Sequence, residues 1–171
     1  MSAGLDRGLL GLYLADHLSG ATGGLARVER MAEDYTDKPW HGDLVSLVRE
    51  LRSERDEVRS IIESLGTSRR PLRQGLAWAG ERLGRLKLNR RLTSRSPMSP
   101  VLELELMRGA VMAKQGLWQV LRDLPAEHHA ALGVEPAELD RLVAQAADQR
   151  DRLERMHAQV RGTAFLEGAA G

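Results

Sequence analysis

The chain has 171 residues, a formal net charge of +1 and no cysteine. This length suits one domain with its own core, because single domains commonly hold about 100 to 200 residues. The lack of cysteine excludes disulfides, thiolate metal sites and cysteine nucleophiles. Leu, Ala, Arg and Glu dominate, whereas Val, Ile and Thr together number only 17, which is typical of helices. We therefore expect a single all-α domain over residues 1–171.

Proline positions divide the chain into helical segments. Each of the six prolines falls between segments of helical apolar periodicity: Pro39, Pro71, Pro97, Pro100, Pro125 and Pro136. Because proline is excluded from helix interiors, this pattern predicts four long helices at 6–35, 42–65, 100–124 and 136–164. The third is expected to begin with Ser99 as its cap and Pro100 in its first turn. Residues 167–171 are expected to fray.

Two of the predicted helices carry an informative pattern on one face. In the first helix the middle, residues 19–24, is rich in glycine, and each glycine there lowers the stability of the helix by about 1 kcal/mol relative to alanine. Either a neighbouring helix packs closely against this surface, or the segment is a functional kink. The third helix is expected to bury one stripe, composed of Leu102, Leu106, Gly109, Ala113, Leu117, Val120 and Leu124.

The connections predict the topology. The links between the first two helices and between the last two are short, so each pair should form an antiparallel hairpin. Residues 66–99 are long enough to return along the whole assembly, which would make the second and third helices parallel. That is the one-crossover topology of ferritin-like four-helix bundles, and it is the fold we expect. An alternating up-and-down arrangement is the other possibility.

The long connection is strongly basic. Residues 69–95 hold nine basic residues and one acidic residue, so the rest of the chain has a net charge of −7. Leu72, Leu76 and Leu83 share one face, which predicts an extra amphipathic helix. Its arginines could engage an acidic protein, lipid headgroups or nucleic acid, or pack against the chain's own acidic helices. The candidate anion-binding residues are Arg69, Arg70, Arg73, Arg82, Arg85, Lys87, Arg90 and Arg91.

Glu154 and His157 form an E-x-x-H pair, one element of the ligand set that binds two irons in ferritin-like bundles. In the alternating arrangement, a single layer would contain Asp16 and the candidate metal ligands His17, Glu103, Glu105, Glu154 and His157. That layer would be either a mononuclear site, with iron or manganese as possible metals, or a buried polar network. If the second and third helices are parallel, no single two-metal layer forms. His41, His128 and His129 are expected at the surface.

Three segments carry a resemblance to other proteins: YLADHLSGATGG at 13–24, LAWAGERLGRLKLNRRL at 76–92, and SPMSPVLELELMRGAVMAKQGLW at 96–118. They resemble recurring stretches of a group of uncharacterised small helical proteins from actinobacteria, and this resemblance implies no particular activity. A looser similarity to ferritin-like bundles rests on helix number and connection length, and implies metal binding.

Motifs for the common enzyme classes are absent from the sequence: there is no phosphate-binding loop, dinucleotide fingerprint, G-x-S-x-G or H-E-x-x-H. We therefore expect a non-enzymatic interaction or scaffold protein without a cofactor, with a ferritin-like metal-binding protein as the alternative. The sequence has neither a signal peptide nor an apolar run of about 20 residues, so we expect a cytoplasmic protein without a transmembrane segment. Exposed apolar stripes would make it a homo-oligomer.

Overall fold

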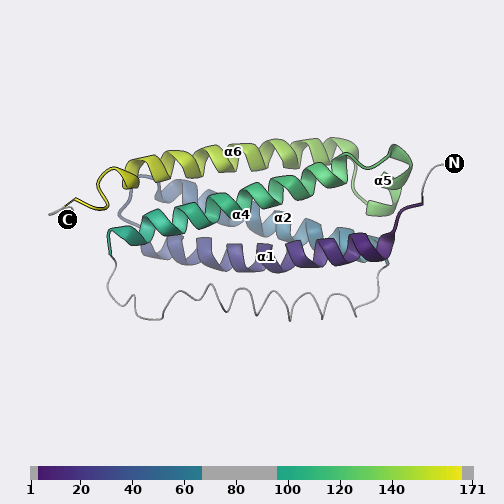
Figure 1. Ribbon diagram of the computed structural model, residues 1–171, viewed down its shortest axis with the longest axis horizontal. Coiled ribbons are helices and arrows are strands. Elements are labelled where there is room, and N and C mark those ends of the chain that lie inside the picture. The colour runs from purple at the N-terminus through teal and green to yellow at the C-terminus, as the bar shows by residue number, and fades with distance from the viewer. Residues whose placement is uncertain (1–3, 67–95, 167–171) are drawn as a thin grey trace.

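The computed structural model describes residues 4–66 and 96–166, where every regular element is a helix (Figure 1). The long helices are α1 (Arg7–Asp34), α2 (His41–Ser64), α4 (Met98–Arg122) and α6 (Pro136–Arg161), and α5 (Ala126–Leu132) is short. The expectation of an all-α protein is confirmed for this part of the chain. None of its helices is long and apolar enough to cross a bilayer. The predicted basic helix, with its candidate anion-binding residues, and the predicted frayed tail lie outside the described residues.

The start of α4 differs from the prediction. α4 begins at Met98 with Pro97 in the cap position, and no side chain caps it. The backbone N–H of Met98 instead donates to Ser96 Oγ at 3.2 Å, so the predicted Ser99 cap is wrong. Pro100 is the third helical residue, where a missing N–H costs no intrahelical hydrogen bond. α6 does begin at Pro136, as predicted.

The seven-residue helix α5 was not predicted. It follows Pro125 and ends at Gly133, which adopts a left-handed conformation with φ of 68°. A Cβ atom on Gly133 would lie 2.6 Å from Ser64 Oγ, so this turn packs closely against the end of α2. α5 thereby closes one end of the assembly. We expected His41, His128 and His129 at the surface. Each of them is partly exposed, which agrees with that expectation only in part.

Two groups of buried apolar side chains form the core. The first apolar cluster includes Leu14 of α1, Ile61 of α2, Trp118 of α4 and Leu142 of α6. The second apolar cluster includes Met31, Leu44, Leu104 and Leu153 from the same four helices. The early parts of α2 and α4 thus meet in one cluster and their late parts in the other, so these helices run parallel (Figure 1). This is the predicted parallel arrangement, and the alternating one is excluded.

α4 buries a different face from the one predicted. Its buried residues are Val101, Leu104, Met107, Val111, Leu117, Trp118 and Leu121, whereas Leu102 and Leu106 are each 40% exposed and Val120 is 46% exposed. Leucine occurs on two faces of α4, so apolar spacing alone did not separate them. The face that is buried also contains Lys114, and a charged residue obscures an apolar stripe in a sequence.

Candidate functional site

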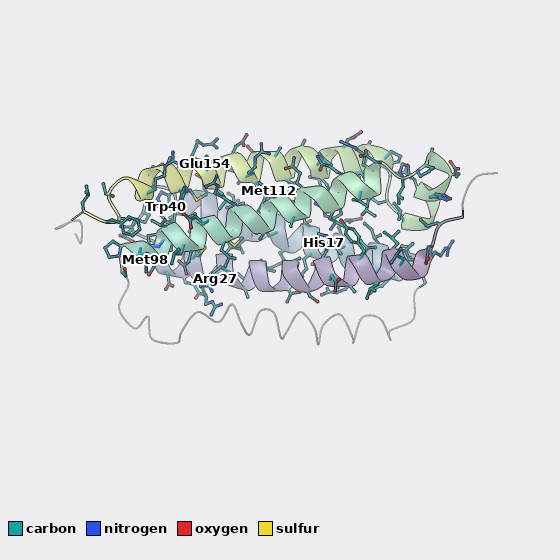
Figure 2. All side chains as sticks on the ribbon, viewed as in Figure 1. His17, Arg27, Trp40, Met98, Met112 and Glu154 are labelled. Carbon is teal, nitrogen blue, oxygen red and sulfur yellow. The ribbon has the colours of Figure 1, made fainter. Side chains whose placement is uncertain are left out.

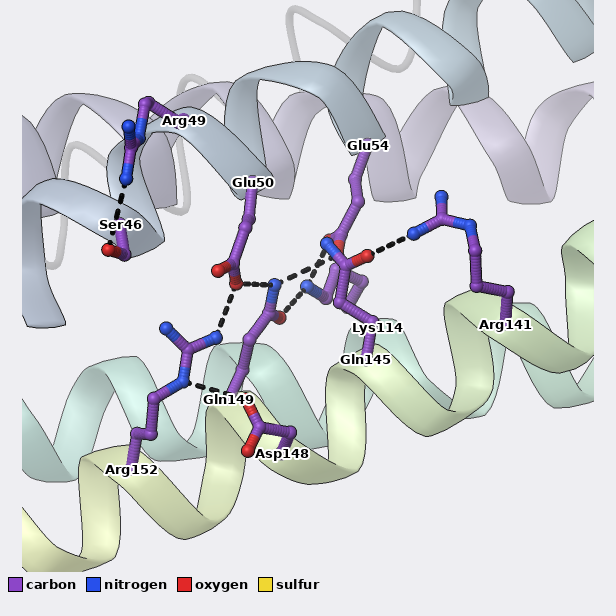
Figure 3. Close-up of polar contacts among 10 residues, drawn as sticks. All are labelled: Ser46, Arg49, Glu50, Glu54, Lys114, Arg141, Gln145, Asp148, Gln149 and Arg152. Carbon is purple, nitrogen blue, oxygen red and sulfur yellow. Dashed lines mark hydrogen bonds and ion pairs between the residues drawn. The ribbon is translucent and has the colours of Figure 1, made fainter.

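A polar network joins α2, α4 and α6 (Figure 3). Along each of these helices, its central residue falls between the residues of the two apolar clusters. Three helices contribute to its centre: Glu54 from α2, Lys114 from α4 and Gln149 from α6. The Lys114 ammonium donates to Glu54 Oε2 and to Gln149 Oε1. The Gln149 amide in turn donates to Glu54 Oε1 at 2.9 Å. The side chains of Glu54 and Lys114 are only 2% and 12% exposed, so this is a buried ion pair.

Further polar side chains surround this centre. Gln145 Nε2 donates to Glu54 Oε1 at 2.8 Å, and Gln149 Nε2 donates to Glu50 Oε2 at 2.9 Å. Arg152 forms an ion pair with Glu50. The carboxylates of Glu50 and Glu54 are therefore matched by two cations, Lys114 and Arg152. Arg152 also pairs with the exposed carboxylate of Asp148, at 2.8 Å, so these three carboxylates share two cations.

Burial and ion pairing shift the pKa of Lys114 in opposite directions. Burial lowers the pKa of the Lys114 ammonium, while the neighbouring Glu54 carboxylate raises it. Removing a charge from water costs several kcal/mol, which is recovered only with a partner in good geometry. Each member of the pair is therefore tolerated inside the protein because the other is present.

The remaining long helix presents small residues at this level. Gly20, Ala21 and Gly24 of α1 face the region where Glu54 and Lys114 meet, and all five residues line one cavity. A Cβ atom built on Gly20 or Gly24 would have no other atom within 4 Å. The interpretation of this segment as a close-packing surface is therefore wrong at these two positions. α1 continues through it as one helix from Arg7 to Asp34.

The cavity between α1, α2 and α4 has a volume of about 290 Å³. Most of its wall is apolar, from side chains that include Leu25, Leu51, Val58, Met107, Val111 and Leu117. Gly20 on α1 and Ala110 and Ala113 on α4 line it and are exposed. The cavity therefore opens to solvent between α1 and α4, and its inner wall carries the buried ion pair.

His17 adds polar character to the cavity wall, and Asp16 and Arg55 add charges. His17 contacts the ring of Tyr13 edge-on, with 4.6 Å between ring centroids. Burial lowers the pKa of His17, more than the nearby Asp16 carboxylate raises it, so the imidazole is neutral at pH 7. Trp118 is fully buried, and its indole N–H has no hydrogen-bond partner within residues 4–66 and 96–166.

The structure separates the predicted metal ligands. His17 lines the cavity, well apart from Glu154 along the helices (Figure 2). Glu103 accepts hydrogen bonds from Arg27 at 2.9 Å and from the Tyr35 hydroxyl at 2.6 Å. The single layer of candidate ligands required the alternating arrangement, so it does not form when α2 and α4 are parallel.

The other three candidate ligands do lie near one another, and Arg108 contacts two of them, Glu154 and His157. His157 Nε2 is 3.3 Å from Glu105 Oε1, and its Nδ1 is 3.3 Å from Arg108 Nη1. Arg108 also pairs with Glu154 at 2.5 Å. Because arginine can only donate, His157 Nδ1 accepts and Nε2 carries the proton toward Glu105. Among the described residues, no group of three or more His, Asp or Glu side chains is placed to hold a metal ion.

The Glu54–Lys114 pair generates a stability prediction. Replacing Lys114 by Met should lower the free energy of unfolding by about 3 to 5 kcal/mol, because it leaves a buried carboxylate without its cation. Adding Glu54→Gln to that variant should recover part of the loss, since the stranded charge is removed. Urea denaturation of the wild type, both single variants and the double variant measures the coupling.

A surface pair serves as the control for this cycle. Arg52 and Glu29 also link two helices, at 2.7 Å, but their side chains are 53% and 37% exposed. Arg52→Met should cost about 1 kcal/mol or less, since exposed pairs contribute little. Strictly additive effects at Glu54 and Lys114, or equal losses in Lys114→Met and Arg52→Met, would contradict the assigned role of the buried pair.

Comparison with known proteins adds no functional assignment to this geometry. No protein-family model matches the chain, and neither curated proteins nor solved structures show a significant match. The feature that departs most from an ordinary helical core is the open apolar cavity whose inner wall is the Glu54–Lys114 pair.

Proposed function

We propose that the protein is a non-enzymatic binding protein that holds a small, largely apolar molecule in the cavity between α1, α2 and α4. The observation that carries this proposal is the cavity itself, which combines an apolar wall with a few convergent polar groups. Such a combination is characteristic of small-molecule sites. The volume of this cavity is near the lower end of the usual range for such sites, about 300 to 1,000 Å³.

The glycines of α1 support this function. Gly20 and Gly24 each cost the helix about 1 kcal/mol relative to alanine. A glycine that lets two helices pack closely repays this cost through contacts, but the space beside these two is open. The helix is thus less stable with glycine at these two positions than it would be with alanine. In exchange, space is left beside the Glu54–Lys114 pair. Residues that lower the stability of a protein and leave space in it are expected where a ligand binds.

Filling the cavity tests the proposal. The hydrocarbon tetralin should raise the melting temperature of the wild-type protein as its concentration rises, because a ligand that binds only the folded state stabilises it. Gly24→Leu should abolish this shift by occupying the space beside Glu54 and Lys114. The variant should itself be at least as stable as the wild type, since it gains helix propensity and fills a void.

The same substitution on the outside of the assembly is the control. Gly109 of α4 is exposed, does not line the cavity, and also has no atom within 4 Å of an added Cβ. Gly109→Leu should leave the tetralin response unchanged. An absent response in the wild type, or an equal response in Gly24→Leu, would reject a ligand site in this cavity.

The interaction or scaffold role expected from the sequence remains a second candidate. It is supported by charge segregation, because residues 4–66 and 96–166 carry 16 Lys and Arg against 22 Asp and Glu, a net charge of −6, while residues 69–95 carry +8. The outer face of α4 also exposes an apolar row of Met98, Leu102, Leu106, Met112 and Val120. That row supports the expected homo-oligomer, since a second copy could cover it.

Retention on heparin at low salt tests whether the basic segment engages an outside anion. The wild type should be retained and should elute as ionic strength rises, because such binding is dominated by charge. Replacing Arg82, Arg85, Arg90 and Arg91 by Gln should abolish retention without lowering the melting temperature. If the wild type is not retained and the variant melts earlier, the arginines serve the chain's own acidic helices.

A ferritin-like four-helix bundle that binds metal is the alternative function. Its supporting observation is the parallel direction of α2 and α4, which the one-crossover topology requires. Against it, Arg108 contacts both Glu154 and His157, and a fixed cation repels a metal ion. Protein purified without a chelating tag should therefore contain less than one equivalent of iron or manganese. Stoichiometric metal would favour the alternative.

A further inference from the structure

We propose that two copies of the chain associate through the outer face of α4, so that the two α4 helices lie antiparallel about a two-fold axis near residue 111. This inference goes beyond a ligand in the cavity and gives the expected homo-oligomer a specific interface. It follows from the low charge of this face, from the spacing of its apolar and small residues, and from the fit of that spacing to its own reverse.

The outer face of α4 carries almost no charge. Nine residues from Leu102 to Val120 are exposed, and only Glu105 among them is charged. The outer face of α6 is different, since six of the ten exposed residues from Ala137 to Arg161 are charged. Charged residues are depleted at the centre of protein interfaces relative to the rest of the surface. α4 therefore has the composition of a surface that another protein covers, whereas α6 has that of a surface in contact with water.

Six apolar or small residues form one seam along this face: Leu102, Leu106, Gly109, Ala113, Gly116 and Val120. They follow one another at alternating spacings of four and three, which is the spacing of contact residues between two packed helices. At about 100° per residue, they fall within an arc of about 80°. Val120 and the two leucines are 40 to 46% exposed, and a Cβ atom on Gly109 or Gly116 would have no neighbour within 4 Å. The seam thus has the pattern of a helix contact, but no helix of residues 4–66 and 96–166 covers it.

The seam is complementary to its own reverse. In two antiparallel helices related by an axis near residue 111, facing residues lie equally far before and after that residue. Each leucine then faces a smaller residue of the second copy, in the pairs Leu102–Val120, Leu106–Gly116 and Gly109–Ala113. Parallel helices would instead place leucine against leucine and glycine against glycine, so their separation would be uneven. A two-fold interface requires such self-complementarity, because both copies use the same surface.

The exposed apolar area is enough for a small specific interface. The apolar row of α4, which includes Met98 and Met112 (Figure 2), is 38 to 62% exposed. With full areas of about 160 to 200 Å² per residue, these five side chains expose about 400 Å² on each copy. Two copies would bury about 800 Å² from the row alone, and the small residues of the seam would bring further atoms into contact, towards the 1,000 Å² or so that a specific interface needs. We therefore expect a dissociation constant in the micromolar range.

The interface and the cavity are separate proposals about adjoining surfaces. Of the exposed residues that border the mouth of the cavity, only Ala113 also lies on the seam. The buried Glu54–Lys114 pair takes no part in the interface. Association is measured without a ligand, so a monomeric chain would leave the proposed cavity function standing.

Sedimentation equilibrium of the full chain tests the association. Well above the expected dissociation constant, the wild type should have twice its chain mass of 18.9 kDa, and dilution should dissociate it. Leu106→Glu should raise the dissociation constant at least about hundredfold, because it places a carboxylate in an apolar contact on both copies. Val45→Glu is the matched control, since Val45 of α2 is also 40% exposed. It should leave the dimer intact.

Introduced cysteines test the direction of the helices, and the chain has no cysteine of its own. In the antiparallel dimer, the two copies of residue 102 lie about 27 Å apart, whereas a disulfide needs Cα atoms within about 7 Å. Leu102→Cys alone and Val120→Cys alone should therefore give almost no disulfide-linked dimer on oxidation. An equimolar mixture of the two variants should give it readily, as seen by non-reducing electrophoresis.

Several results would overturn this interface. One is a wild type that keeps a mass of 18.9 kDa at every concentration. If that monomer also melts earlier as Leu106→Glu than as Val45→Glu, another part of the same chain covers the row in place of a second copy. A dimer that survives Leu106→Glu uses a different surface. Cross-linking within Leu102→Cys alone, without cross-linking in the mixture, means parallel helices, and the proposal fails.

Discussion

The requirement that a buried lysine meet a buried carboxylate constrains the relative positions of three helices. Glu54, Lys114 and Gln149 come from α2, α4 and α6, and each satisfies groups on the other two. Shifting one helix by a single residue would turn its side chain by about 100° and move it about 1.5 Å along the axis. A stranded buried charge costs about 3 to 5 kcal/mol, a large part of the 5 to 15 kcal/mol by which domains are typically stable. The network therefore selects one register.

α1 is positioned by different contacts. Its two ends are held by the apolar clusters, through Leu14 on one side and Met31 on the other. Glu103 of α4 also holds α1 in place, because it accepts hydrogen bonds from Arg27 and Tyr35 near the end of α1. Between these attachments, the glycines leave α1 without side chains that would reach the ion pair. The cavity is thus a consequence of firm packing at the ends and small residues in the middle.

Much of the helical architecture could be predicted from the sequence. Pro136 located the start of α6, because proline is favoured in the first turn of a helix and excluded from its interior. The length of the connection between α2 and α4 favoured their parallel path, because the chain is long enough to return along the whole assembly. α5 was missed because seven residues provide too little periodicity. The single metal layer was predicted only for the alternating arrangement, so it does not form when α2 and α4 run parallel.

The candidate site was harder to predict, although the sequence contains a signal for it. Glu54, Lys114 and Gln149 each occupy a position where an apolar residue would continue the stripe of its helix. Polar residues that interrupt the stripes of three helices at one level indicate a buried network. Recognising this needs the register between helices, which long-range packing decides. The glycines of α1 were ambiguous for the same reason, since only the neighbouring helix shows whether the space beside them is filled.

The side opening of the cavity also bears on how quickly its occupant would exchange. Exposed Gly20, Ala110 and Ala113 border the opening, so a molecule could reach the ion pair without the helices first coming apart. Association would then approach the rate of diffusional encounter, and the lifetime of the complex would depend on the strength of its inner contacts. Under the proposed function, occupancy of such an open cavity would follow changes in ligand concentration closely, whereas a sealed core would retain the ligand.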